Sequence, residues 1–428
     1  MNQADTAWML VATALVLLMT PALAFFYGGL VRSKNALNTM MMSFISLGFV
    51  AVAWALLGYS LAFTTGNDWI GDLSNSFLRG VGLDVRTGTT IPHALFMSYQ
   101  GTFAIITAAL ISGAIVERMR FSAYVLFISL WAVLVYSPLA HWVWGGGWLA
   151  KMGALDFAGG TVVHVNAAVA ALAAALVIGP RSDYKKASIL PHNVPFVLLG
   201  AGLLWFGWFG FNAGSALAAS PIAGLAFVTT MLAPAATLVV WTIVDVARTG
   251  KPTSVGAATA IVVGLVAVTP AAGFVSPLSA LALGAIAAVP SYFAIQLRAK
   301  TSLDDSLDVV AAHGVGGTVG ALLTGVFAQK SLNGVADGLL FGNPRQVLIQ
   351  GVAILAAIVF SGVASFALLK LVGLVVPLRA SAEDEAVGLD ISMHGEEAYL
   401  HSGGMDTITS DSGEAIPAFT AKSTVPVS

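Results

Sequence analysis

The chain has 428 residues, of which 57% are apolar and only 9% are charged, and its formal net charge is −2. Soluble domains carry about 25% charged residues, so most of the surface of this protein must face lipid. The sequence has no cysteine, which excludes disulfides and thiol catalysis, and no basic patch that would suit nucleic acid.

Eleven apolar stretches follow one another along the chain, each about 20 or more residues long. A helix of about 20 residues crosses about 30 Å of hydrocarbon, and long continuous runs favour helices over the strands of a barrel. We therefore predict an all-α integral membrane protein with about eleven transmembrane helices. In chain order they are residues 8–30, 41–63, 93–115, 122–144, 157–179, 194–217, 222–247, 253–272, 275–297, 307–328 and 346–377.

Lys and Arg are distributed unevenly between the segments that connect these stretches. If the N-terminus lies outside, 14 of the 19 basic residues fall on the inner side. Because basic residues are retained on the cytoplasmic side, the sequence predicts an N-out, C-in topology. The five basic residues on the outer side are then Arg79, Arg86, Lys151, Lys330 and Arg345.

The two ends of the chain differ from the rest. Ala22-Leu23-Ala24 resembles a signal-peptide cleavage site, but residues 1–7 contain no Lys or Arg. Since a signal peptide has a basic segment before its apolar core, we expect no cleavage. We predict a transmembrane domain over 1–377 and an acidic, Ser/Thr/Gly-rich cytoplasmic tail over 378–428, of which the last 25 or so residues are expected to be disordered.

Two histidines occupy matched positions in the two halves of the chain. Five helices in each half would invert the second half relative to the first, so we predict an inverted five-helix repeat plus one helix. His164 lies in the fifth predicted helix and His313 in the tenth, each among small and β-branched residues. Because inverted repeats place the pathway where the halves meet, we predict that these histidines meet there.

Other roles for the two histidines are open at this point. A mid-membrane imidazole faces a cavity or a partner, but it can also be a packing residue bonded to backbone. A metal site needs a third ligand at binding spacing, and none is present. Small residues around both histidines suit close helix packing as well as a narrow apolar passage. No phosphate-binding glycine motif follows a strand, so we expect no cofactor.

Aromatic residues and glycines gather at the predicted outer ends of three helices. They occur in residues 141–147, in residues 207–215 and around Phe103. Such residues can form the aromatic belt of a membrane protein, or they can form a mouth in which rings lie against backbone. Asp156, about two turns before His164, can cap the fifth helix and can also hold a negative field that favours a cation.

Long runs of this sequence resemble the ammonium transporter family (Amt/Mep, with Rh relatives). They are HWVWGGGWLAKMGALDFAGGTVVHVNAA, GWFGFNAGS, AAHGVGG and GLDISMHGEEAY, and the resemblance covers about residues 5–400. It implies transport of ammonium or ammonia by a homotrimer with one pore per subunit, in the inner (plasma) membrane. It also implies a PII-type regulatory protein on the cytoplasmic face. Residues 401–428 fall outside the pattern.

The resemblance implies roles for residues at the outer mouth and in the pore. Trp144, Phe103 and Ser215 match an outer site that recruits ammonium, and Phe103 and Phe211 match stacked rings that close the mouth.

Deeper in the membrane, His164 and His313 match twin histidines that line the pore, and Trp208 matches their pore-lining neighbour. Asp156 matches an aspartate that supports the site. We expect NH₄⁺ to lose its proton near the stacked rings and NH₃ to pass the histidines. Whether the proton also crosses is open.

Two other classes of function compete with transport. An intramembrane serine protease needs a serine activated by a base, but Ser215 is placed at the mouth and no G-x-S-x-G motif occurs, so we expect no enzyme. An ammonium sensor with little flux is the alternative that the tail leaves open.

Overall fold

The computed structural model describes residues 1–186 and 189–399, which form helices and loops and contain no β-strand. Ten helices or continuous runs of helices in this part are long and apolar enough to cross a membrane. The predicted all-α membrane fold is therefore confirmed. Each of the eleven predicted stretches coincides with a helical segment, but the segment expected over 253–272 is shorter than a full span.

The helices of the first half begin near the N-terminus and end before residue 179. They are α1 (Gln3–Leu30), α2 (Ala36–Ala53), α3 (Tyr59–Phe63), α4 (His93–Ile111), α5 (Phe121–Trp131), α6 (Ser137–Val143), α7 (Trp148–Met152) and α8 (Asn166–Ile178). Short π-helical turns join α2 to α3 and α5 to α6, and a third, Gly160–Val165, leads into α8.

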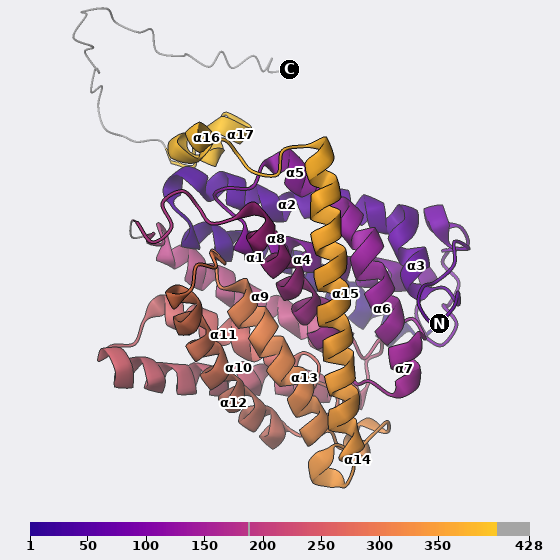
Figure 1. Cartoon of the computed structure of the whole chain (residues 1–428). Helices are drawn as coiled ribbons and strands as arrows, with labels where there is room; N and C mark the ends of the chain where they lie inside the picture. The colour runs from indigo at the N-terminus through magenta and orange to yellow at the C-terminus, as the bar shows by residue number, and fades with distance from the viewer. Residues whose placement is uncertain (187–188, 400–428) are drawn as a thin grey trace, which may run out of the picture.

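The second half contains the helices from α9 onward. They are α9 (Val194–Gly214), α10 (Pro221–Thr249), α11 (Ser254–Val268), α12 (Pro277–Lys300), α13 (Gly316–Phe327), α14 (Lys330–Asn333), α15 (Arg345–Val375), α16 (Ala382–Val387) and α17 (Leu389–His394). A π-helical turn, Val310–Val315, leads into α13. Figure 1 shows α15 running along the bundle, with α16 and α17 near one of its ends and α14 at the other.

The helix α11 is shorter than predicted because the chain turns at Pro270. Proline has no N–H to continue a helix, and the carbonyl of Pro270 instead accepts a hydrogen bond from Phe157 N at 3.1 Å. A Cβ on Gly160 would lie 2.5 Å from the Pro270 ring. The turn after α11 is thus packed directly against the segment that leads to His164.

Close contact between α1 and α9 joins the two halves of the chain. A Cβ on Gly200 would lie 2.4 Å from the backbone nitrogen of Phe26, and a Cβ on Gly207 would lie 2.4 Å from Met19 Cγ. Small residues let helix backbones approach closely where the hydrophobic effect cannot drive association.

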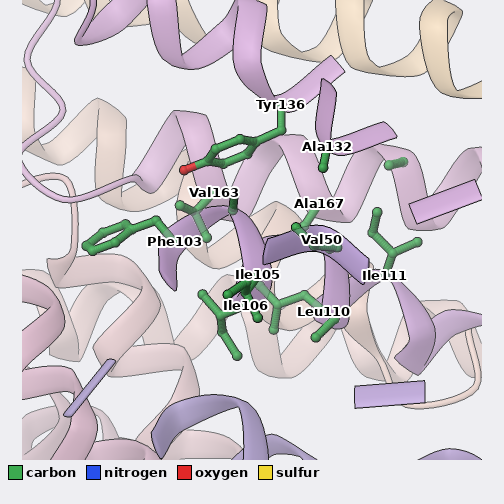
Figure 2. Packing of buried hydrophobic residues seen from close by; sticks show 14 of the residues in the cluster. Val50, Phe103, Ile105, Ile106, Leu110, Ile111, Ala132, Tyr136, Val163 and Ala167 are labelled. Carbon is green, nitrogen blue, oxygen red and sulfur yellow. The ribbon is translucent and has the colours of Figure 1, made fainter. Parts of the chain in front are cut away.

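The helix α4 occupies the interior of the bundle. It belongs to the most buried of the candidate membrane spans, since 83% of the 18-residue apolar stretch of that span lies inside the bundle. Figure 2 shows Ile105, Ile106 and Leu110 of α4 close to Val163 and Ala167. A helix that is apolar all round is a buried one, whereas α10, α12 and α15 carry large apolar side chains that are exposed. Among them are Val239, Ile243, Leu297, Leu355 and Val363.

Buried charges tie together the loops at the end of the bundle that carries α16 and α17, which we call the tail face. Glu117 accepts hydrogen bonds from Arg32, Asn35 and Arg181. Arg181 also binds Asp304 through Nε at 2.9 Å and Nη2 at 2.8 Å. Burial alone would raise the pKa of Glu117, but hydrogen bonding to Arg32 and the charge of Arg181 hold that pKa below its ordinary value.

The first part of the tail docks on this face. Arg379 pairs with Glu385, whose carboxylate also accepts a hydrogen bond from Ser182 N. Asp390 accepts hydrogen bonds from the backbone nitrogens of Leu37 and Asn38 and so caps α2. The predicted domain boundary at 377 remains a prediction, and the expected disorder of the last 25 or so residues concerns residues outside the described part.

We predict that Gly200→Val lowers the thermal midpoint of the protein in detergent. The new side chain must displace the backbone of α1, and such overpacking costs about 1–3 kcal/mol. Gly202→Val is the matched control, because Gly202 is exposed and a Cβ there would meet no atom within 4 Å. Equal midpoints for the two variants would show that α1 and α9 do not need this contact.

Candidate functional site

The two matched histidines meet inside the bundle, as predicted. Nδ1 of His313 lies 3.2 Å from Nδ1 of His164, and the ring centroids are 5.2 Å apart. The side chains are buried, with residue exposures of 1% and 3%. Each histidine lies in one of the π-helical turns before α8 and α13, and such turns often occur at functional sites.

The geometry of the pair restricts its protonation. A hydrogen bond between two Nδ1 atoms needs one Nδ1–H donor and one bare Nδ1 acceptor, so two neutral rings in opposite tautomers satisfy it. The pair then presents one bare Nε2 and one Nε2–H. Nε2 of His164 is buried and has no hydrogen-bond partner in the described part of the chain, so it is free to bind a small polar molecule.

Glycine allows the two segments to approach. A Cβ on Gly317 would lie 3.0 Å from His164 Cβ and 3.1 Å from the carbonyl oxygen of Gly160. A larger residue at position 317 would therefore push the two histidine-bearing segments apart. The small residues noted in the sequence serve both helix packing and the histidine contact.

Asp156 caps the segment that carries His164. Its two carboxylate oxygens accept hydrogen bonds from the backbone nitrogens of Gly159, Gly160, Thr161 and Val162, at 2.7 to 3.1 Å. The predicted capping role is confirmed. Both carboxylate oxygens accept hydrogen bonds from backbone N–H groups. The N–H groups at the start of a helix favour a negatively charged group there.

Asp305 plays the same part before His313, and sequence reasoning missed it. It accepts hydrogen bonds from Val309 N at 3.1 Å and Val310 N at 2.7 Å. Asp156 precedes His164 by eight residues, and Asp305 precedes His313 by eight. This equal spacing is the sequence signal that could have identified Asp305. Burial and the neighbouring Asp308 raise the pKa of Asp305 to about 7.

Two stacked rings lie next to the histidines. The centroids of Phe103 and Phe211 are 4.1 Å apart and their planes differ by 20°. Phe211 lies 6.1 Å from the His164 ring, and Trp208 stacks on the same imidazole at 5.5 Å. Trp208 is held by a hydrogen bond from its Nε1 to Thr269 Oγ1 at 2.9 Å.

Trp144, Phe103 and Ser215 line one cavity of about 320 Å³ free volume, which we call the vestibule. It lies at the opposite end of α4 from the tail face. The Trp144 ring is perpendicular to Phe103 at 6.1 Å, and its Nε1 donates to the carbonyl of Asp156 at 2.8 Å. The three residues predicted to act together are therefore adjacent.

Tyr99 positions this group and was also missed from sequence. Its hydroxyl donates to the carbonyls of Gly210 and Phe211, at 3.0 and 2.9 Å, and lies 3.3 Å from Ser215 Oγ. Ser215 itself donates to the carbonyl of Phe211 at 2.8 Å. The lone pairs of its oxygen remain available to a donor in the vestibule. A tyrosine in an apolar helix gives no sequence signal for such a role.

A narrow passage lies on the other side of the stacked rings. Its lining includes both histidines, Trp208 and Phe211 and is otherwise apolar, and it offers about 10 Å³ of free volume, about what one water-sized molecule needs. His313 also lines a second cavity of about 320 Å³ at the tail face. Vestibule, stacked rings, histidine pair and tail-face cavity thus follow one another through the bundle.

The family comparison matches almost the whole described chain. The model of the Ammonium Transporter Family matches residues 7–399. An ammonium transporter of Bacillus subtilis is 50% identical over 405 residues, which cover 94% of this chain and 100% of the relative. An ammonium transporter of Aquifex aeolicus is 51% identical over 404 residues, with 93% and 94% covered.

Solved structures show the same fold. Mep2 of Candida albicans superposes with a TM-score of 0.86 and 35% identity, covering 98% of this chain and 95% of that chain. A structure named Sensor Amt Protein superposes with a TM-score of 0.85 and 32% identity, covering 91% and 98%.

We predict that Asp305→Asn flattens the pH dependence of stability. Because folding raises the pKa of this carboxyl from 3.8 to about 7, its contribution to stability is fully present below about pH 4. It is lost as the pH rises through about 7. The thermal midpoint of the wild type should therefore fall more steeply between about pH 5 and 7.5 than that of the variant. Asp84→Asn, at an exposed carboxyl, is the control and should follow the wild type.

Proposed function

The chain belongs to the ammonium transporter family, and on that premise we propose that it takes up NH₄⁺ at the vestibule and conducts NH₃ past the histidine pair. The observation that carries this proposal is the placement of two hydrogen-bonded histidines behind stacked rings, between two cavities.

The vestibule supplies what a small cation with N–H donors needs. The faces of Trp144 and Phe103 attract a cation by about 0.5–2 kcal/mol per ring. Ser215 Oγ can accept one N–H bond, because its own proton is donated to Phe211 O. K⁺ has no N–H to donate, so it gains the ring attraction but not the directional bond.

The energy of crossing favours the neutral species. Moving a bare cation into a medium of low dielectric has an idealised cost of about 20 kcal/mol. With the Lys head group as a stand-in, pKa about 10.4, removing the proton at pH 7 costs about 4–5 kcal/mol. Deprotonation is therefore the less costly route, and K⁺, which has no proton to lose, is excluded.

The histidine pair supports passage of NH₃ in the narrow region. NH₃ both donates and accepts hydrogen bonds, and the pair presents one bare Nε2 and one Nε2–H. The two imidazoles therefore replace part of the hydration that NH₃ leaves behind, while the apolar lining holds no carboxylate that would retain a cation. Whether the released proton crosses with NH₃ decides between electrogenic transport and simple conduction.

We assign the vestibule to the outer side and the tail face to the cytoplasm. This follows the distribution of basic residues, because Arg32, Arg118 and Arg181 lie at the tail face with other Lys and Arg side chains. From the family resemblance we place the protein in the inner (plasma) membrane, with a PII-type regulator binding the tail face. A homotrimer is the assembly that the family resemblance implies.

Two other functions compete with transport. A sensor with little flux is the second candidate, since a structural neighbour is named Sensor Amt Protein. An intramembrane serine protease finds no support, because the Ser215 hydroxyl donates to a backbone carbonyl and the relatives are named transporters.

We predict that His164→Ala combined with His313→Ala abolishes the response of proteoliposomes to an ammonium pulse. Current and internal pH are recorded together. An ammonium-specific, K⁺-insensitive current that disappears in the double variant would establish charge transport through the pair, and a pH change without current would mean that NH₃ moves alone. His192→Gln, at a histidine bonded to Val31 O and Tyr399 outside the passage, is the control. No response from the wild type would favour the sensor.

We predict that Trp144→Leu raises the ammonium concentration that gives half-maximal flux by about three- to thirtyfold, because one cation–π face is lost. Trp144→Phe should recover part of the difference. Trp69→Leu removes an exposed tryptophan that does not line the vestibule and should change little. Equal effects of the two leucine variants would argue against recruitment at Trp144.

A further inference from the structure

A basic side chain reaches the wall of the vestibule. The guanidinium carbon of Arg86 lies 3.8 Å from the ring centroid of Phe96 and 5.8 Å from that of Phe63. All three residues line the vestibule together with Trp144 and Phe103. Among the described residues of this lining, Arg86 is the one whose side chain is charged. A cation-recruiting cavity thus has a fixed positive charge in its wall.

The loop that carries Arg86 is held in place. Arg86 N donates to Ile91 O at 3.1 Å, and Thr89 N donates to Arg86 O at 3.0 Å, which closes a turn. Thr90 Oγ1 donates to the Asp5 carboxylate at 2.5 Å. Asp5 also accepts a hydrogen bond from Ala219 N. The turn is therefore fixed to the start of α1 and to the segment after α9, so the charge stays at the wall.

The charge of Arg86 is not neutralised by an ion pair. In residues 1–186 and 189–399 no carboxylate lies within ion-pair distance of Arg86, and the side chain is only half-buried. Its guanidinium stacks on the ring of Phe96. Two like charges in a partly solvated cavity repel each other, by an amount that depends on the local dielectric constant and that salt screens.

We propose that Arg86 sets the affinity of the vestibule for ammonium, by opposing the entering cation and by covering the ring of Phe96. The inference rests on the proposed transport function. A transport site must bind its substrate firmly enough to collect it and weakly enough to release it. The attraction of Trp144 and Phe103 supplies the first requirement. The repulsion from Arg86 supplies the second and directs the cation to the rings nearest the passage.

A charge series at position 86 tests this directly. The variants are Arg86→Lys, Arg86→Gln and Arg86→Glu, and the control is Arg79→Gln, at an exposed arginine that does not line the vestibule. Initial flux, as current or internal pH change, is measured in proteoliposomes against ammonium concentration. Each titration is done at ionic strengths of about 0.01 M and about 0.15 M, where the screening lengths are about 30 Å and 8 Å.

We expect Arg86→Gln to lower the half-saturating ammonium concentration about three- to tenfold at low salt, and Arg86→Glu to lower it further. Arg86→Lys, which keeps the charge, and Arg79→Gln should stay near the wild type. The differences should shrink at the higher ionic strength.

Two results would overturn the inference. One is a half-saturating concentration that is unchanged in Arg86→Gln and Arg86→Glu while flux persists. The other is an Arg86→Lys variant that behaves like Arg86→Gln, which would assign the effect to the shape of the loop. If the wild type gives no flux, the transport proposal fails first. Arg86 is then judged by ammonium-dependent thermal stabilisation of the same variants in detergent, where an unchanged concentration dependence would overturn it.

Discussion

The hydrogen bond between the Nδ1 atoms of His164 and His313 is the contact on which the arrangement of the passage depends. It joins one residue from each half of the chain, 149 positions apart. It forms only if the two helical segments that carry the histidines lie close enough for the imidazole rings to be in contact. Gly317 permits that approach. The apolar surroundings disfavour a charged imidazole, so the bond between two neutral rings is the arrangement that the interior can hold.

The two aspartates explain how buried polar backbone can lead to this contact. Each histidine lies near the start of a helical segment, where backbone N–H groups have no partner within the helix. Inside a membrane protein such groups cannot rely on water. Asp156 and Asp305 bind them with carboxylate oxygens, and the pseudo-symmetric spacing of aspartate and histidine supports the inverted repeat predicted from sequence.

Much of the fold was predictable because lipid imposes one requirement, a long apolar helix, and this requirement is visible in composition. The meeting of His164 and His313 was also predictable, since they are the two histidines that lie at mid-span, each in the last helix of its half. The shorter α11 was missed although Pro270 marks its end in the sequence, because a proline can also lie inside a membrane helix, as Pro21, Pro234 and Pro290 do. Tyr99 and Arg86 were missed for another reason. A tyrosine inside the apolar helix α4 and an arginine in the loop before it have no distinctive spacing, and the contacts of both depend on how distant segments pack.

The bond between the two Nδ1 atoms also gives the pair a direction. With one ring donating and the other accepting, the pair has two arrangements that differ in which histidine keeps the shared proton. A proton that enters at one Nε2 and leaves at the other converts one arrangement into the other. The next proton from the same side then finds the entry nitrogen already protonated, until the rings return to the first state. A pair used in this way would have to be reset after each proton, whereas a neutral molecule could pass it in either arrangement.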